Sequence, residues 1–365
     1  MGFRCGIVGL PNVGKSTLFN ALTRTAAAAA ANFPFCTIEP NVGEVPVPDD
    51  RLEMLARIAG SQKVIPTRIT FVDIAGLVRG ASKGEGLGNQ FLANIREVEA
   101  IAHVLRCFED GDVAHIEGRI DPVADAETVE TELMLADLES IERRLQGLAR
   151  RIRGGDKEAA VQDRLLRLAQ EALEAGRPAR TVSVAQEDAR AWRGLQLLTA
   201  KPVLYVCNVD EGAAASGNAH SARVAELANA TGAASVVISA AIEAEIAQLN
   251  EAERVEFLVE MGLGESGLER LIRAGYRLLD LITFFTVGPK EARAWTVPEG
   301  TLAPQAAGVI HTDFERGFIR AETIAYSDFV ACGGEQGAKD TGKMRSEGKT
   351  YRVADGDVLH ILFNA

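Results

Sequence analysis

The chain has 365 residues, enough for about two or three domains that bury a sizeable core. Its composition, 47% hydrophobic and 25% charged, excludes wholesale disorder and fibrous repeats. With 39 basic and 51 acidic residues the formal charge is −12, which argues against a protein that coats nucleic acid by bulk positive charge. An RNA contact would therefore be a local patch, and we expect no DNA partner.

The N-terminus carries no signal-peptide pattern, and no stretch approaches the roughly 18 consecutive apolar residues of a spanning helix. We therefore expect neither export nor a membrane partner. The five cysteines are odd in number, scattered and without a CxxC pair, which is typical of a reducing cytoplasm.

The first predicted elements are a strand at Phe3 to Val8, a glycine-containing loop, and a helix over Ser16 to Leu22. The loop Gly9 to Ser16 satisfies GxxxxGK[ST], the phosphate-binding pattern, in the strand–loop–helix setting that its mechanism needs. Backbone N–H groups would cradle phosphates, Lys15 would reach the β and γ oxygens as a catalytic group, and Ser16 would hold Mg²⁺. The phosphate-binding residues expected here are Asn12, Val13, Gly14, Lys15, Ser16 and Thr17.

Two further segments supply the other parts of a nucleotide switch. Phe71 to Gly76 is an apolar strand ending in DxxG, which places Asp73 to bind Mg²⁺ and the Gly76 N–H to meet a γ-phosphate. Thr37 lies between the phosphate loop and that strand, where a switch threonine would complete the metal ligands. The predicted metal ligands are thus Ser16, Thr37 and Asp73.

Later apolar strands alternate with helices, which predicts an α/β fold with a mostly parallel sheet. These strands are expected at Arg68 to Val72, Ile101 to Phe108, Val203 to Cys207 and Ser235 to Ile238. Between them lies a helical stripe interrupted by Gly154-Gly155, which predicts an inserted antiparallel helical hairpin. From about Thr283 the pattern changes to short strands separated by turns, a small β-rich module. The expected domains are 1–125 and 199–281 for the nucleotide-binding part, 126–198 for the hairpin and 282–365 for the C-terminal module.

The segment after a late strand should read the base. G proteins recognise guanine with an NKxD motif. Here the corresponding sequence is Asn208-Val209-Asp210-Glu211, with a glutamate at the aspartate position and a valine at the lysine position. Losing a paired acceptor can cost orders of magnitude in discrimination, so ATP is favoured over GTP. Asp210 leaves a register-shifted guanine reading open. Ser239 stands where a loop would back the base, and with Asn208, Val209 and Glu211 it completes the predicted nucleotide site.

The hydrolysis machinery is unusual because Leu77 follows DxxG, where a glutamine would orient the attacking water. The alternatives are substrate assistance, a K⁺ ion held by Asn12, a group supplied by a partner, or His103. His103 lies in an apolar strand, where a histidine is more often part of the core. Slow turnover is the expectation.

Together, Gly9 to Ser16, Asn32 to Asn41 and Phe71 to Val78 closely resemble the YchF/Obg-like ATPase family over nearly the whole chain. The resemblance implies a P-loop ATPase with a G domain, an inserted coiled-coil hairpin and a C-terminal TGS domain. It further implies that ATP is preferred to GTP, that the protein associates with the ribosome and its RNA, and that the family's proposed catalytic histidine matches His103. A GTPase of the Obg class and a nucleotide-gated binding module with negligible hydrolysis remain the alternatives.

The hairpin tip supplies an independent hint of a ribosomal partner. It gathers five arginines and a lysine with a single acid among them. This pattern fits either a solvated helix end or a nucleic-acid contact. The six residues are Arg143, Arg144, Arg150, Arg151, Arg153 and Lys157.

Overall fold

The structure is a computed structural model that describes residues 3–30, 41–74, 87–109 and 120–364. The chain divides into two compact units, Met1–Val45 with Thr70–Leu278 and Pro46–Ile69 with Leu279–Ala365. The predicted fold class is confirmed. None of the described helices is long and apolar enough to cross a membrane.

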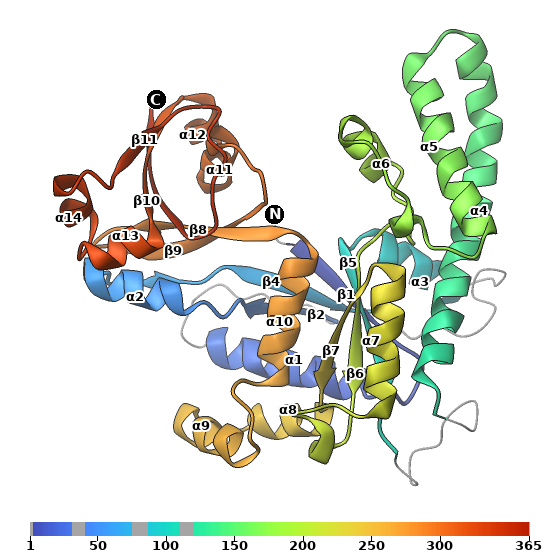
Figure 1. The fold of residues 1–365 in the computed structure, drawn as a ribbon, viewed down its shortest axis with the longest axis horizontal. Coiled ribbons are helices and arrows are strands. Elements are labelled where there is room, and N and C mark those ends of the chain that lie inside the picture. The colour runs from blue at the N-terminus through green and yellow to red at the C-terminus, as the bar shows by residue number, and fades with distance from the viewer. Residues whose placement is uncertain (1–2, 31–40, 75–86, 110–119, 365) are drawn as a thin grey trace. The chain divides into compact units, whose positions relative to one another are not determined.

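The first unit is built on a six-stranded sheet of order β2-β4-β1-β5-β6-β7, in which β1, β5, β6 and β7 pair in parallel (Figure 1). Its central strands are buried along almost their whole length, as parallel strands covered on both faces must be. The strands are β1 (Phe3–Val8), β2 (Val42–Pro46), β4 (Arg68–Asp73), β5 (Ala100–Arg106), β6 (Val203–Asn208) and β7 (Ala234–Ile238). The helices are α1 (Lys15–Ala30), α3 (Leu87–Arg96), α4 (Pro122–Arg153), α5 (Lys157–Glu174), α6 (Ala189–Gly194), α7 (Ala219–Thr231), α8 (Ala240–Ile246), α9 (Glu251–Glu260) and α10 (Gly267–Leu278).

The predicted hairpin is present as α4 and α5, which run side by side beyond the sheet (Figure 1). Asp121 and Asp156 cap the two helices, and Gly155, with φ of 84°, makes the turn between them. The second half of the predicted apolar stripe was expected to include Leu168, but Leu168 is 38% exposed, whereas Leu166 and Ala169 are buried in the core of the hairpin. The N-terminal half of α4, together with α3 and α7, covers one face of the sheet.

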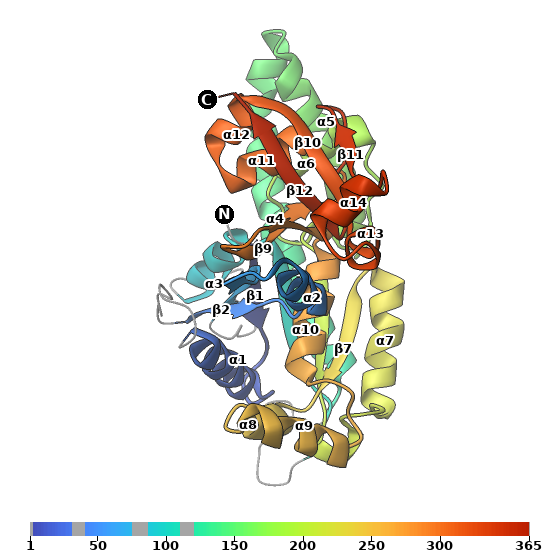
Figure 2. The same cartoon turned by 90° about the vertical axis from the view of Figure 1, so that its left-hand side faces the viewer.

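The second unit contains a sheet of order β11-β10-β12-β8-β9-β3 with helices around it (Figure 2). Residues 46–69 were expected in the nucleotide-binding part, but β3 pairs with β9 and α2 packs on β8 and β9, so Pro46–Ile69 groups with the C-terminal unit. Its elements are α2 (Asp50–Ala59), β3 (Val64–Ile65), β8 (Leu281–Val287), β9 (Ala292–Pro298), α11 (Ala303–Ile310), α12 (Thr312–Arg316), β10 (Phe318–Ala325), α13 (Tyr326–Ala331), α14 (Glu335–Asp340), β11 (Arg345–Glu347) and β12 (Asp357–Phe363).

Candidate functional site

The phosphate loop joins β1 to α1 in the predicted strand–loop–helix arrangement. Asn12 and Gly14 both have positive φ, 64° and 91°. Asparagine and glycine tolerate this conformation, which turns backbone N–H groups inward as an anion-binding concavity. The loop opens directly onto the N-terminus of α1, where the helix dipole favours negative charge.

Asn208 fastens the phosphate loop to the loop that follows β7. Its amide Nδ2 donates to the Val13 carbonyl at 2.9 Å, and its Oδ1 accepts from the Ala240 N–H at 2.9 Å. A Cβ on Gly14 would lie 2.2 Å from Asn208 Nδ2, so glycine is required here by close approach as well as by its φ. The carboxyl end of β6 thereby sets the shape of the phosphate loop.

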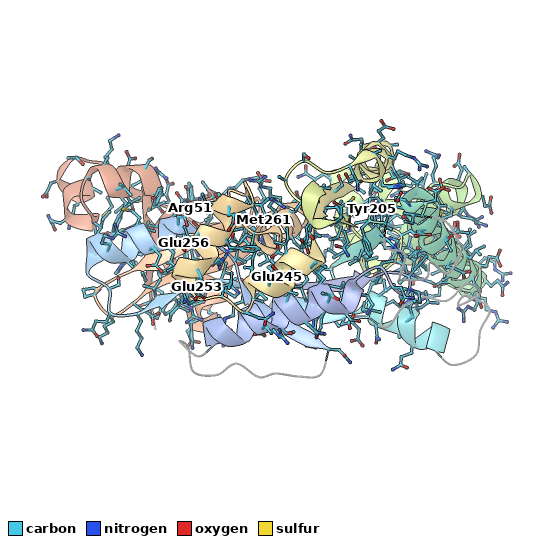
Figure 3. The ribbon with its side chains drawn as sticks, turned by 90° about the horizontal axis from the view of Figure 1, so that it is seen from below. Arg51, Tyr205, Glu245, Glu253, Glu256 and Met261 are labelled. Atoms are coloured by element: carbon cyan, nitrogen blue, oxygen red, sulfur yellow. The ribbon has the colours of Figure 1, made fainter. Side chains whose placement is uncertain are left out.

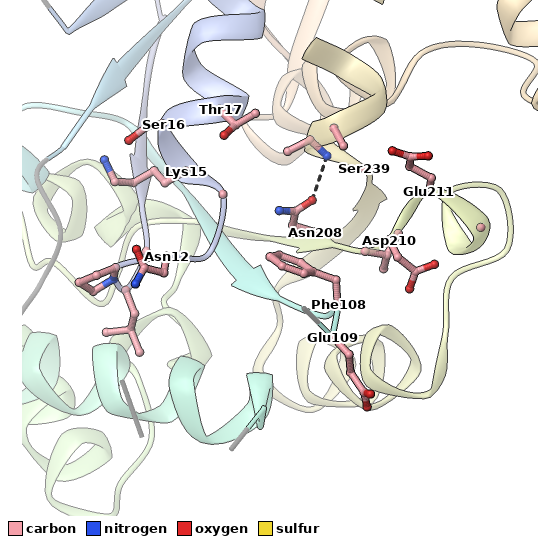
Figure 4. Close-up of a pocket in the computed structure, with 18 residues that line it drawn as sticks. Asn12, Lys15, Ser16, Thr17, Phe108, Glu109, Asn208, Asp210, Glu211 and Ser239 are labelled. Carbon is pink, nitrogen blue, oxygen red and sulfur yellow. Dashed lines mark hydrogen bonds between the residues drawn. The ribbon is translucent and has the colours of Figure 1, made fainter. Parts of the chain in front are cut away.

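These loops enclose a pocket of about 1150 Å³ at the carboxyl end of the sheet (Figure 4). A pocket at this edge is where open parallel sheets bind nucleotides. Its lining is Gly9, Leu10, Pro11, Asn12, Gly14, Lys15, Ser16, Thr17, Phe108, Glu109, Asn208, Val209, Asp210, Glu211, Gly212, Ser239, Ala240 and Ala241. Of the predicted phosphate-binding residues only Val13 is absent from the lining; its side chain is 2% exposed in the core.

Lys15 Nζ donates a hydrogen bond to Asp73 Oδ1. The two side chains are 12% and 17% exposed, so each neutralises a charge that would otherwise be costly in this half-buried position. Lys15 is a predicted phosphate ligand and Asp73 a predicted metal ligand, and the structure brings them together.

Phe108 is a pocket residue that the sequence reasoning missed. It follows β5, and its ring lies beside Asn208 in the pocket wall (Figure 4). Behind it Arg106, 1% exposed, donates from Nε to the Phe108 carbonyl at 3.3 Å and holds its guanidinium 4.7 Å from the ring centroid. The available signal was its position at the carboxyl end of a central parallel strand, where ligand-contacting residues gather.

The residues predicted to read the base occupy distinct environments. Val209 is 2% exposed and belongs to the core cluster under α3, α4 and α7, whereas Glu211 is exposed. Asp210 Oδ1 accepts from the Ala213 N–H at 3.1 Å and caps the short turn that follows. Ser239 is 2% exposed, and its Oγ has no hydrogen-bond partner among the described residues.

His103 does not line the pocket. It is 3% exposed in the middle of β5, with its ring 5.9 Å from that of Tyr205. Burial, with a smaller contribution from Arg180, lowers the pKa of His103 to about 3. A neutral histidine inside the sheet is placed as a core residue, and the catalytic role that the resemblance implies stays a prediction.

Three expected residues, Thr37, Gly76 and Leu77, lie outside the described residues. Within the described part of the chain no group of three or more His, Cys, Asp or Glu could hold a metal. Ser16 and Asp73 nevertheless supply the hard oxygen donors that Mg²⁺ takes when substrate phosphates and waters fill the remaining positions. The described donors therefore fit a metal that arrives with a nucleotide.

Comparison with known proteins agrees with this geometry. A family model described as "50S ribosome-binding GTPase" matches residues 4–141, and the model YchF-GTPase_C, a protein of unknown function, matches residues 281–364. The "Ribosome-binding ATPase YchF" of Haemophilus ducreyi is 58% identical and that of Bacillus subtilis 53% identical, each over 100% of both chains.

A solved structure, the Schizosaccharomyces pombe YchF GTPase, is 36% identical with a TM-score of 0.87, covering 99% of this chain and 98% of that one. A GTP-binding protein of Pyrococcus horikoshii, 21% identical with a TM-score of 0.63, shares the fold. With a P-loop pocket on a parallel sheet and full-length identity above 50% to several members, the chain belongs to the YchF family.

Proposed function

We propose that the chain binds ATP with Mg²⁺, hydrolyses it slowly, and uses its nucleotide state to control binding to the ribosome. The observation that carries the proposal is that one pocket is lined by Lys15 and Ser16 on the phosphate-loop side and by Phe108, Glu211 and Ser239 on the other side. The relatives named ribosome-binding ATPases support the partner and the nucleotide.

At the phosphate end, Lys15 exchanges Asp73 for the β and γ oxygens when a nucleotide binds. Asp73 and the Ser16 hydroxyl are then free to hold Mg²⁺, which Thr37 would complete. The metal supplies charge neutralisation at the transferring phosphate. Phosphate binding by Lys15 and metal binding by Asp73 are thereby linked, because each breaks the Lys15–Asp73 hydrogen bond and so frees the other side chain.

At the base end, the structure supports a reader that lacks guanine specificity. Glu211 is exposed on the pocket wall, and Asp210 uses one carboxylate oxygen to cap the following turn. That bond disfavours the register-shifted guanine reading. The unpartnered Ser239 Oγ offers a hydrogen bond that either base could take.

The second candidate is a GTPase of the Obg class, because the solved relative and the family model are both described as GTPases. The Glu211→Asp variant separates the two. If the longer side chain of Glu211 weakens guanine recognition, shortening it should increase the affinity for GTP more than the affinity for ATP. Val209 is left unchanged in this test because lysine at a site 2% exposed would bury a charge.

We propose the hairpin tip as one ribosomal contact. Arg150, Arg151 and Arg153 end α4 on exposed positions, whereas Arg144, also expected at the tip, donates to the Leu195 carbonyl at 2.7 Å. Replacing the three exposed arginines with alanine should reduce the salt dependence of co-sedimentation with ribosomes. The matched control replaces Arg177, Arg190 and Arg193, three exposed arginines that follow α5 in the chain, and should leave that slope unchanged.

The third candidate, a nucleotide-gated module with negligible hydrolysis, is distinguished by single-turnover measurement on ribosomes. A chain that binds ATP but never forms ADP, alone or with ribosomes, would establish it.

A further inference from the structure

Two strongly exposed apolar side chains lie close together on α9. Val255 is 54% exposed and Val259 73%, and exposed Ala252 continues the same face at helical spacing. The opposite side of α9 is anchored by Leu258, which packs in a cluster with Ile242 and Ile246 of α8. No described residue covers the Val255–Val259 face. Uncovered apolar faces of this kind mark interaction sites.

The surroundings of this face are acidic. Glu253, Glu256 and Glu260 of α9 are exposed next to the two valines, and exposed Glu245 lies on the adjoining α8. Figure 3 shows Glu245, Glu253 and Glu256 together when the molecule is seen from below. The one arginine of α9, Arg254, is turned to Glu269, with both side chains about a quarter exposed. The exposed side of α9 therefore presents an apolar strip with a rim of glutamates along one side.

An apolar centre with a charged rim of one sign is the composition of a protein-docking surface, and its sign selects the partner. The glutamates repel a phosphate backbone, so RNA is disfavoured. A lysine- or arginine-rich amphipathic segment would pair with the rim while its apolar residues cover Val255 and Val259.

We propose that the face of α9 formed by Ala252, Val255 and Val259, with its rim of Glu245, Glu253, Glu256 and Glu260, docks a basic segment of a ribosomal protein. The inference rests on the proposed function and adds to it a contact with protein, distinct from the basic hairpin tip. Helix α8 connects the surface to the pocket, because it begins at Ala240, the residue after Ser239, and packs against α9. A partner held on α8 and α9 is thus placed to sense the base loop.

The test uses the full-length chain and purified large ribosomal subunits. A photo-crosslinking amino acid, p-benzoylphenylalanine, replaces Val255 or Val259, and a reference chain carries it at Arg151 of the hairpin tip. The expected result is a crosslink from α9 to a ribosomal protein and one from the tip to ribosomal RNA. A crosslink from α9 to RNA, or none from α9 while Arg151 crosslinks, overturns the docking surface.

Charge-reversed chains provide the second measurement. Glu256→Lys with Glu260→Lys should weaken co-sedimentation about tenfold at low salt and less at high salt, and it leaves the capping box of Asn250 and Glu253 intact. Glu97→Lys with Glu226→Lys, which changes net charge equally at exposed sites elsewhere, should not weaken it. Equal effects of the two pairs would contradict the docking surface. A wild-type chain that does not sediment with subunits overturns the proposed function as well, whereas retained sedimentation with unaffected α9 variants overturns the docking surface alone.

Discussion

Phe108 lines the pocket although no sequence motif indicated it. Buried Arg106 lies against its ring and restrains it, and we propose that the ring stacks on the base. Stacking on one base contributes about 1–3 kcal/mol and does not discriminate among bases. On the proposed function, Phe108 would contribute affinity for either base, and Glu211 would weaken guanine recognition.

We predict that Phe108→Ala weakens ATP binding and GTP binding alike, by about five- to 150-fold, as the loss of one stacking contact requires. Phe108→Trp keeps an aromatic face and should bind within about threefold of wild type. Equilibrium titration with both nucleotides measures the ratio, and unchanged urea unfolding of both variants controls for folding. A loss confined to ATP would mean that Phe108 reads the base.

His103 gives a pH prediction. Its folded-state pKa is lowered to about 3 by burial, from 6.5 when exposed. His103 stays neutral in the folded chain but takes up a proton in the unfolded chain. The free energy of unfolding therefore falls as the pH drops below 6.5, by about 2 kcal/mol at pH 5. His103→Leu should lose about 2 kcal/mol less between pH 7 and pH 5 in urea unfolding.

The same variant tests the catalytic expectation. Since His103 is absent from the pocket lining, His103→Leu should keep ATP turnover within about twofold at neutral pH. A turnover lowered tenfold or more in a chain that still unfolds cooperatively would restore the catalytic role.

The phosphate end of the site could be predicted from the sequence because the spacing of the motif residues directly determines which groups lie in the loop. Asn12, Gly14 and Lys15 lie where GxxxxGK[ST] requires. The base end was less predictable. Whether Val209 faces the base or the core depends on sheet packing, and the pairing of Phe108 with Arg106 depends on which side chains leave the end of β5 on the pocket side.

Among the helices, α4 carries a buried carboxylate that binds the chain returning from the hairpin. Asp137, 1% exposed, accepts from the Leu198 N–H at 2.9 Å and from the Thr199 N–H at 2.8 Å and hydroxyl at 2.7 Å. Burial raises the pKa of Asp137, and these three bonds act in the opposite direction. The returning chain after the hairpin is thereby fixed against α4.

We predict that Asp137→Ala lowers the free energy of unfolding by about 2–4 kcal/mol, because it strands two buried N–H groups. Asp137→Asn, which keeps one acceptor oxygen, should cost less. Glu139→Ala, two residues along on an exposed side chain 61% accessible, should cost under about 0.5 kcal/mol. Equal losses for Asp137 and Glu139 in urea unfolding would show that the buried clamp contributes nothing.

Elements with strong periodicity were predictable, and elements defined by long-range pairing were not. The hairpin and the strand at Phe3–Val8 appear as expected because their apolar patterns are local. The two-residue β3 exists only through its pairing with β9, which no local pattern announces. That pairing is why Pro46–Ile69 belongs with the C-terminal unit.

Over the whole chain, the candidate contacts divide by charge. The hairpin tip carries exposed arginines suited to a phosphate backbone, and α9 carries exposed glutamates suited to a basic protein segment. A chain of net charge −12 can thus meet a particle made of RNA and basic protein through two separate surfaces of its first unit. Sequence composition alone supported only the first surface, since an apolar face is recognised as exposed only once the fold shows what it packs against.

The central claim is that the pocket prefers adenine. Its most direct test is equilibrium titration of the nucleotide-free, full-length chain with labelled ATP and labelled GTP, in Mg²⁺ and at matched K⁺. The account predicts that ATP binds at least about tenfold more tightly, about 1.4 kcal/mol. Tighter binding of GTP would contradict it, and would mean that Asp210 leaves its cap on the turn to do the work of the missing aspartate.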